Sequence, residues 1–192
     1  MQRRAAIRRI SLIGGGLLLV FSGTKVYQRY KSPHFQSLKE HGPLLAALAE
    51  TILPGGTDSP GAGEAGVGDF IGKMVRDCTD RKTQNNFIDG LEALAGRARS
   101  RYGKDFGQCS PEERTALLTE CERDGSVYAG RAGKLENYLL GDPFFTTLKK
   151  YTILGYCTSQ AGATRGLRYD YIPGKYVGSV ILTPGQRGWA TQ

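Results

Sequence analysis

Apolar residues recur with a helical period through most of the chain, and this period restricts the fold to packed helices. The clearest stripe consists of Val67, Phe70, Ile71, Met74, Val75 and Cys78. Comparable stripes occupy residues 44–52, 83–102, 110–121 and 142–159. The five segments predict a mainly α protein, a small helical bundle of about five helices.

Helix starts and stops agree with these stripes. Ser110-Pro111-Glu112-Glu113 has a capping Ser, a Pro at the first helical position and a Glu that completes a capping box. Asp142-Pro143 suggests the same cap-plus-Pro arrangement before the last helix. Pro54-Gly55-Gly56 ends the first helix, and residues 57–61 prolong that turn.

The net charge of +8 is concentrated at the N-terminus. Residues 1–31 contain seven basic residues and no acidic one, which leaves 19 basic and 18 acidic residues in positions 32–192. A nearly neutral globular part has little affinity for phosphates, so nucleic acid is not an expected partner.

The first 23 residues resemble an export signal. Arg3, Arg4, Arg8 and Arg9 precede an apolar stretch over residues 10–21, which is about 18 Å long as a helix. A bilayer core needs about 20 apolar residues, so we predict a signal peptide over residues 1–23. The pair Arg3-Arg4 resembles a twin-arginine signal; a general secretory signal and an uncleaved anchor are the alternatives. The expected location is periplasmic, with attachment to the inner membrane through an uncleaved signal or through a complex.

The remaining chain divides into three parts. Residues 24–41 are predicted as a polar tether and residues 42–166 as the helical domain. Residues 167–192 are rich in Tyr, Val and Ile and are predicted as an extended C-terminal arm, with one short hairpin as an option.

Cofactor motifs are absent from the sequence. There is no CxxCH for covalent haem, no GxGxxG that opens a helix after a strand, and no phosphate loop. His34 and His41 lack partners at metal-ligand spacing, so both are expected to be solvated loop residues. We therefore expect no cofactor, no metal and no catalytic residue in this chain.

Four cysteines leave several readings open. Cys109 and Cys121 flank one helix about 18 Å apart, too far to pair with each other. Cys78, Cys121 and Cys157 fall on apolar helix faces, where thiols are usually small buried hydrophobes. A disulfide among these three, which export would permit, and an iron–sulfur or metal site are the alternatives.

Several strings, taken in order, resemble the gluconate 2-dehydrogenase subunit 3 family. They are LAETILP at 48–54, TDSPGA at 57–62, EAGVGDFI at 64–71, FFTTLK at 144–149, TILGY at 152–156, TSQAGA at 158–163 and YIPGKY at 171–176. The resemblance covers about residues 44–180. It implies a non-catalytic small subunit that escorts, exports and stabilises a large FAD-dependent dehydrogenase of the glucose–methanol–choline (GMC) type. Such a partner oxidises sugars, sugar acids or polyols and passes electrons to a cytochrome c subunit or the respiratory chain.

Two segments are candidates for the partner interface. The rigid turn at Pro54 either shapes a helix connection or contacts the partner. The arm contributes Tyr169, Tyr171, Tyr176 and Trp189, residue types that are favoured in interfaces. The rival functions are a stand-alone periplasmic module, which binds a small ligand or is tethered to the membrane, and a small enzyme of unknown chemistry.

Overall fold

The computed structural model describes residues 31–57, 59–125, 140–168, 174, 179, 181 and 186–189. In chain order the named elements are α2 (Phe35–Glu40), α3 (Gly42–Ile52), α4 (Val67–Asp77), α5 (Arg81–Tyr102), η1 (Phe106–Gln108), α6 (Pro111–Gly125), α8 (Phe144–Thr158) and η2 (Gly162–Gly166). No strand is present among these described residues, although an isolated parallel bridge joins Arg168 to Trp189. The prediction of a mainly α bundle is confirmed.

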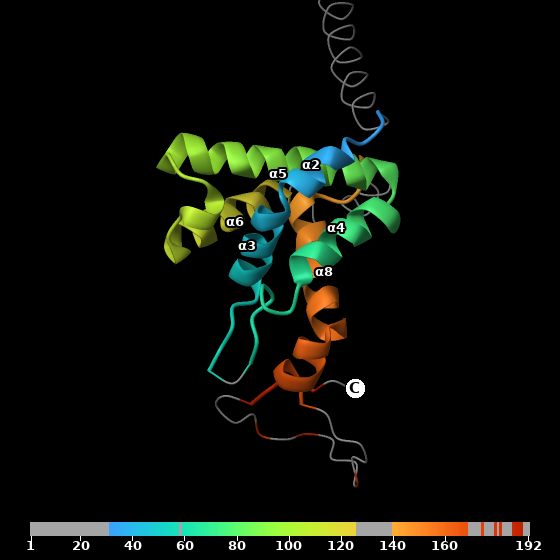
Figure 1. Cartoon of the computed structure of the whole chain (residues 1–192), viewed down its shortest axis with the longest axis vertical. Coiled ribbons are helices and arrows are strands. Elements are labelled where there is room, and N and C mark those ends of the chain that lie inside the picture. Colours follow the sequence, from blue (N-terminus) through green and yellow to red (C-terminus); the bar gives the residue numbers. More distant parts are fainter. Residues whose placement is uncertain are drawn as a thin grey trace, which may run out of the picture.

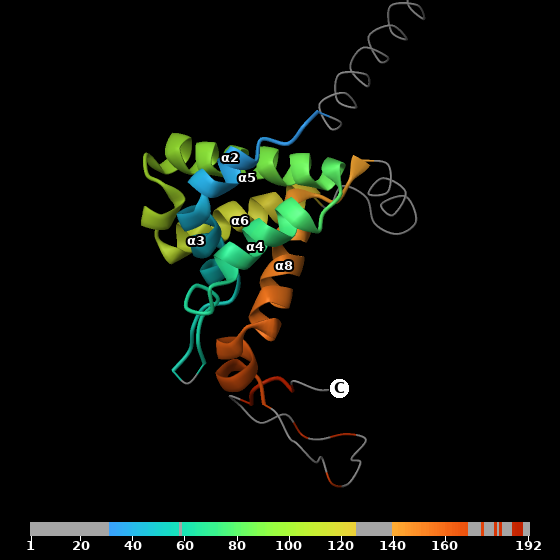
Figure 2. The same ribbon diagram turned by 45° about the vertical axis from the view of Figure 1, so that its right-hand side comes forward.

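The long helix α5 lies across one end of the bundle, and α3, α4 and α8 extend away from it (Figures 1 and 2). α3 packs against α4, and both α4 and α5 pack against α8. The second half of α8 continues beyond the other helices. The described residues of the connection between α3 and α4, 53–57 and 59–66, extend in the same direction.

The ends of α5 and α6 follow local capping rules. The Ser110 hydroxyl accepts a hydrogen bond from the Glu113 backbone at 3.3 Å, and the Glu113 carboxylate accepts one from the Ser110 backbone at 2.8 Å. The predicted capping box is therefore confirmed. The N-cap of α5 is Asp80, whose side chain accepts two backbone N–H bonds, and its C-cap is Gly103, with a left-handed φ of 66°.

The start of α8 differs from the prediction by one residue. Pro143 is the N-cap itself, so Asp142 does not cap the helix. Instead, the Asp142 backbone N–H donates to the hydroxyl of Thr83 at 2.9 Å, and its carbonyl accepts from Asn86 at 3.2 Å. Side chains of α5 thus fix the segment that enters α8, a tertiary contact that local sequence does not reveal.

The predicted tether over residues 24–41 ends earlier than expected. Residues 35–40 form α2, and Leu38 is only 6 % exposed within the core. The hydroxyl of Ser37 donates to the carboxylate of Glu92 on α5 at 2.7 Å. This correction arises because α2 offers too short an apolar stripe to be recognised by periodicity.

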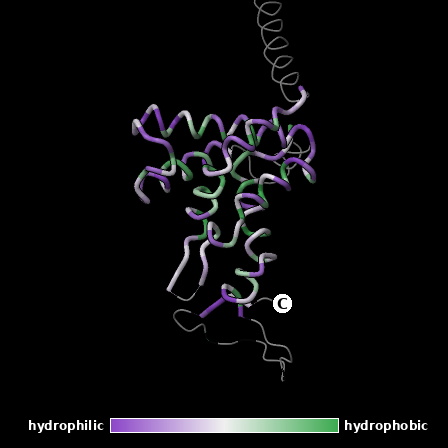
Figure 3. Tube along the Cα trace, viewed as in Figure 1, coloured by the Kyte–Doolittle hydropathy of each residue, from purple (hydrophilic) through white to green (hydrophobic). Residues whose placement is uncertain are grey.

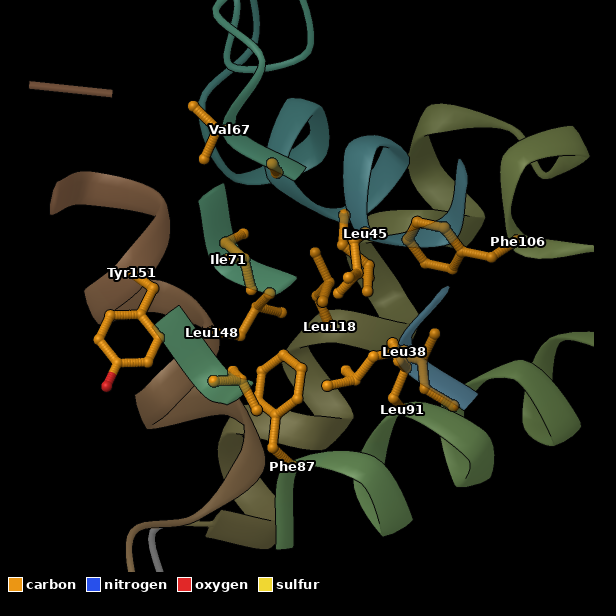
Figure 4. Close-up of a cluster of buried hydrophobic side chains, with 14 of the residues drawn as sticks. Leu38, Leu45, Val67, Ile71, Phe87, Leu91, Phe106, Leu118, Leu148 and Tyr151 are labelled. Atoms are coloured by element: carbon orange, nitrogen blue, oxygen red, sulfur yellow. The ribbon is translucent and has the colours of Figure 1, made fainter. Parts of the chain in front are cut away.

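The core forms where the predicted stripes meet (Figure 4), and hydrophobic residues concentrate at the same junction (Figure 3). The largest fully buried apolar side chains are Phe87, Phe106, Leu45, Leu48, Ile71, Leu91, Leu94, Leu117, Leu148, Val67 and Val75. Each contributes about 1.5–3 kcal/mol relative to an exposed position. The core therefore contains side chains from every major helix, and α8 contributes to it through Leu148 in its first half.

Glycine permits the closest helix contacts. A Cβ on Gly68 of α4 would lie 2.8 Å from the backbone nitrogen of Ala46 on α3. A Cβ on Gly155 of α8 would lie 2.6 Å from the ring of Phe70. These two positions let α3, α4 and α8 approach one another more closely than larger residues would allow.

Candidate partner interface

The projecting half of α8 exposes apolar side chains. Ile153 is 46 % exposed and Leu154 is 40 % exposed, and Cys157, one turn further along, is also exposed. The opposite face of the helix is buried through Leu148, Tyr151, Thr152 and Gly155. Adjacent exposed apolar residues on a projecting helix are a candidate surface for a protein partner. We call Ile153, Leu154 and Cys157 the α8 patch.

The α3–α4 connection is attached to α8 through Tyr156. The Tyr156 hydroxyl donates to the carbonyl oxygen of Pro60 at 2.8 Å. Burial raises the pKa of this hydroxyl above its ordinary value, so it remains a neutral donor at physiological pH. Pro60, Gly61 and Ala62 are buried at this contact. The turn is therefore packed against α8 rather than free in solvent.

A second link joins η2 to the same turn. Arg165 pairs with Glu64 at 2.5 Å, with both side chains more than half exposed. An exposed ion pair contributes at most about 1 kcal/mol.

The Ser159 hydroxyl donates to the Tyr156 carbonyl at 2.8 Å and accepts from the Gly162 N–H at 2.9 Å. Ser159 thus sets the angle at which η2 leaves α8.

Residues near the C-terminus contact the segment that follows η2. The backbone N–H of Arg168 donates to the carbonyl of Gly188 at 2.7 Å, and its guanidinium lies 4.5 Å from the ring centroid of Trp189. Trp189 stays 42 % exposed. The two ends of the predicted arm therefore contact each other, and a cation–π contact of this kind is worth about 0.5–1 kcal/mol.

The structure places two of the predicted interface residues. Pro54 is exposed at the start of the α3–α4 connection, and Trp189 is exposed beside Arg168. Tyr169, Tyr171 and Tyr176 lie outside the described residues, as do Arg3 and Arg4 of the predicted export signal. Their roles stay predictions.

Sequence reasoning missed the residues that build this end. Ile153 and Leu154 fall off the buried stripe of α8, and that mismatch was the available signal of an exposed apolar face. The partners Tyr156–Pro60 and Arg165–Glu64 are distant in sequence, so no local pattern indicated them.

All four cysteines are free in the structure. Cys109 is buried and Cys121 is partly buried, and burial raises the pKa of both thiols. Cys78, which follows α4, and Cys157 are exposed, so their expected place on buried apolar faces is wrong. The candidate disulfide among Cys78, Cys121 and Cys157 stays a prediction.

Within the described ranges, no group of three or more His, Cys, Asp or Glu residues could hold a metal ion. His41 lies with its Nδ1 2.8 Å from the Ser37 carbonyl, and His34 precedes α2. The helices of this part are also too short or too polar to cross a bilayer.

A groove of about 300 Å³ lies between α2 and α4 on another face. Its lining includes the apolar residues Phe35, Leu38 and Leu45 and the charged residues Lys39, Asp69, Lys73 and Arg76. Arg76 is already paired with Asp77 through two bonds of 2.7 and 2.8 Å. This volume is at the lower limit of small-ligand pockets.

Comparison with known protein families gives a match over most of the chain. A family model described as gluconate 2-dehydrogenase subunit 3 matches residues 39–174, which include α3, α4, α5, α6, α8 and η2. No curated protein and no solved structure matches the chain significantly. The matched range contains the α8 patch and the turn that Tyr156 holds.

Proposed function

The chain belongs to the gluconate 2-dehydrogenase subunit 3 family, and from this premise we propose that it is a non-catalytic small subunit that escorts, exports and stabilises a large flavin-dependent dehydrogenase. The family description makes it a subunit type of a dehydrogenase complex. The division of labour within that complex is our proposal.

The main support for the proposal is the exposure of the apolar α8 patch. Ile153 and Leu154 lie on the projecting half of α8, inside the range that the family model matches. Burying such side chains against a partner is worth roughly 25 cal/mol per Å² of apolar surface. A subunit whose task is association needs a surface of this kind, whereas an enzyme needs a cleft with converging polar groups.

We assign the chemistry to the partner. The one GxGxxG string of the sequence, residues 61–66, follows the helix α3 and not a strand, so it lacks the context in which Rossmann-type domains bind FAD. The FAD is therefore expected in a GMC-type subunit. That subunit would oxidise a sugar, sugar acid or polyol and pass electrons to a cytochrome c subunit. The role of this chain is then to complete and stabilise the folded flavoprotein.

The escort role depends on the N-terminal segment. A cofactor-loaded partner is already folded, and a folded protein without a signal of its own needs a signal-bearing companion. Arg3 and Arg4 supply the twin-arginine pattern that such a companion requires. The assembled complex would then be periplasmic, held at the inner membrane by its other subunits or by an uncleaved signal.

Affinity purification of tagged chain from its native cell tests the proposal. The wild-type chain should retain a yellow flavoprotein in a fixed ratio, whereas Ile153→Asp/Leu154→Asp should retain little of it. Both residues are exposed, so the variant should keep its helical spectrum and melting temperature. Ala93→Asp, at an exposed site on α5, is the matched control and should bind normally. Equal recovery with all three chains would reject the α8 patch as the interface.

One observation favours a second function, a ligand-binding or membrane-tethered module. The groove between α2 and α4 combines apolar residues with the exposed cations Lys39 and Lys73, a combination that would suit an amphiphilic anion. A calorimetric titration of the purified chain with anionic phospholipid vesicles distinguishes this function, because an escort subunit should give no saturable heat.

A further inference from the structure

Three glycines surround one carboxylate at the base of the α3–α4 connection. Glu50, in the last turn of α3, accepts the backbone N–H of Gly55 at 3.0 Å with one oxygen and that of Gly63 at 2.7 Å with the other. A Cβ on Gly61 would overlap the carboxylate, and a Cβ on Gly63 would lie 3.0 Å from one of its oxygens. The glycines therefore provide both the donors and the space for this side chain.

The rest of the connection closes around the same point. The Gly56 N–H donates to the Ser59 carbonyl at 2.9 Å, and the Ala62 N–H donates to the Leu53 carbonyl at 3.0 Å. Ala62 is fully buried in the core. Backbone N–H groups that converge on a carboxylate resemble the backbone nests that bind anions. Here the anion belongs to the chain itself.

The position of this turn matters for α8. Its Pro60 carbonyl accepts the Tyr156 hydroxyl, and Tyr156 lies three residues after Ile153 on the same helix. Side chains at this spacing are neighbours on a helix surface, about 5–6 Å apart at Cβ. The conformation that Glu50 imposes on the turn is thus transmitted, through Pro60 and Tyr156, to the edge of the α8 patch.

We propose that Glu50 is the positioning residue of the dehydrogenase-binding surface: its carboxylate holds Gly55 and Gly63 in the one arrangement in which the turn and α8 present a single rigid face. The inference rests on the proposed function for the identity of the partner. The exposed edge of the turn, from Pro54 to Thr57, then forms the second half of the contact beside Ile153 and Leu154.

The chemistry favours a carboxylate over its nearest substitutes. The two N–H donors each bond a different oxygen of Glu50, and hydrogen bonds to a charged acceptor are about twice as strong as neutral ones. Glutamine offers one oxygen and turns an NH₂ group toward the other donor. Glu50→Gln should keep one of the two bonds, and Glu50→Ala should lose both.

Amide hydrogen exchange of the free chain tests the carboxylate without any partner. In Glu50→Ala the amides of Gly55 and Gly63 should exchange at least about tenfold faster, because the closed turn becomes one state among several. Acetate should slow their exchange in this variant by entering the vacated nest, and chloride at equal ionic strength should not. The control Glu40→Ala removes an exposed carboxylate on α2 and should leave both amides protected and insensitive to acetate.

Affinity for the flavoprotein that copurifies with wild-type chain gives the second readout. If the turn is competent in about one tenth of Glu50→Ala molecules, the apparent Kd rises about tenfold. Glu50→Gln should give an intermediate value, and acetate should restore part of the affinity of Glu50→Ala. Unchanged exchange, or faster exchange with unchanged affinity, would overturn the inference. A wild-type chain that retains no dehydrogenase is a different failure, because it rejects the proposed function while the exchange experiment still reports on the carboxylate.

Discussion

Tyr156 and Pro60, 96 residues apart in sequence, are joined by a hydrogen bond of 2.8 Å from the phenol hydroxyl to the backbone carbonyl. Pro60 is buried, so water has little access to its carbonyl oxygen, and the Tyr156 hydroxyl is the hydrogen-bond donor at this point. This contact attaches the α3–α4 connection to the half of α8 that projects from the bundle.

Tyr156→Phe should lower the free energy of unfolding by about 1 kcal/mol, since it leaves a buried carbonyl without its donor. Urea denaturation monitored by circular dichroism measures this change. Tyr102→Phe is the control, because the described part of the chain offers its hydroxyl no hydrogen-bond partner. Equal stability of both variants would mean that water replaces Tyr156 at no cost.

Two glycine substitutions should have opposite effects. Gly68→Ala should destabilise the protein by about 1–3 kcal/mol, because the new methyl group meets the backbone of Ala46. Gly96→Ala should stabilise it by about 0.5–1 kcal/mol, because Gly96 lies in an open stretch of α5 where alanine favours the helix. Thermal melting of the two variants gives the comparison, and a destabilised Gly96→Ala would contradict it.

Asp80→Ala should cost about 1 kcal/mol at neutral pH through loss of the α5 N-cap. Burial raises the pKa of Asp80, but hydrogen bonds from Thr83 and Lys82, with the charge of Lys82, outweigh it and leave the pKa below its usual range. A depressed folded-state pKa adds stability above the unfolded value of about 3.9, and that stability disappears as pH falls through the folded-state pKa. The gap between wild type and variant should therefore narrow below about pH 4. A gap independent of pH would show that the charge of the cap is unimportant.

Deletion of residues 167–192 should leave a cooperative thermal transition but weaken binding to the flavoprotein. The buried helical stripes lie before Ser159, and in the described part of the deleted segment Arg168 contacts Gly188 and Trp189. Scanning calorimetry and copurification separate the two effects. A lost transition would assign the segment to the core.

Replacing Arg3 and Arg4 by Lys should leave both this chain and the flavoprotein in the cytoplasm. Immunoblots of periplasmic and cytoplasmic fractions measure the distribution. Lysine keeps the positive charge of arginine. A loss of export in this variant would therefore be due to the missing arginine pair and not to a change in net charge. Normal periplasmic flavoprotein in this variant would reject the escort role.

Local rules were sufficient for much of the fold. The Val67–Val75 stripe and the Ser110–Glu113 capping box depend on neighbours within one or two helical turns, and both appear as expected. The failures involve distant partners. Asp142 looked like a cap, yet Thr83 and Asn86 of α5 determine its hydrogen bonds.

The candidate interface was predicted only in part, for the same reason. Pro54 was chosen for its place in a rigid turn and Trp189 by residue type, and both lie at the end of the molecule where the turn, η2 and the C-terminal residues meet. The exposed pair Ile153–Leu154 depends on which side of α8 the bundle covers. Their mismatch with the buried stripe was a local signal, but the side of α8 that the bundle covers is a property of the packed helices.

The α8 patch also has a consequence for how the protein must be produced. A projecting helix with uncovered isoleucine and leucine is an adhesive surface for other copies and for unfolded chains. Chain synthesised in excess of its partner would therefore be prone to self-association and proteolysis. If the chain is the small subunit that we propose, balanced synthesis with its partner, rather than greater intrinsic stability of this chain, sets how much intact complex a cell can accumulate.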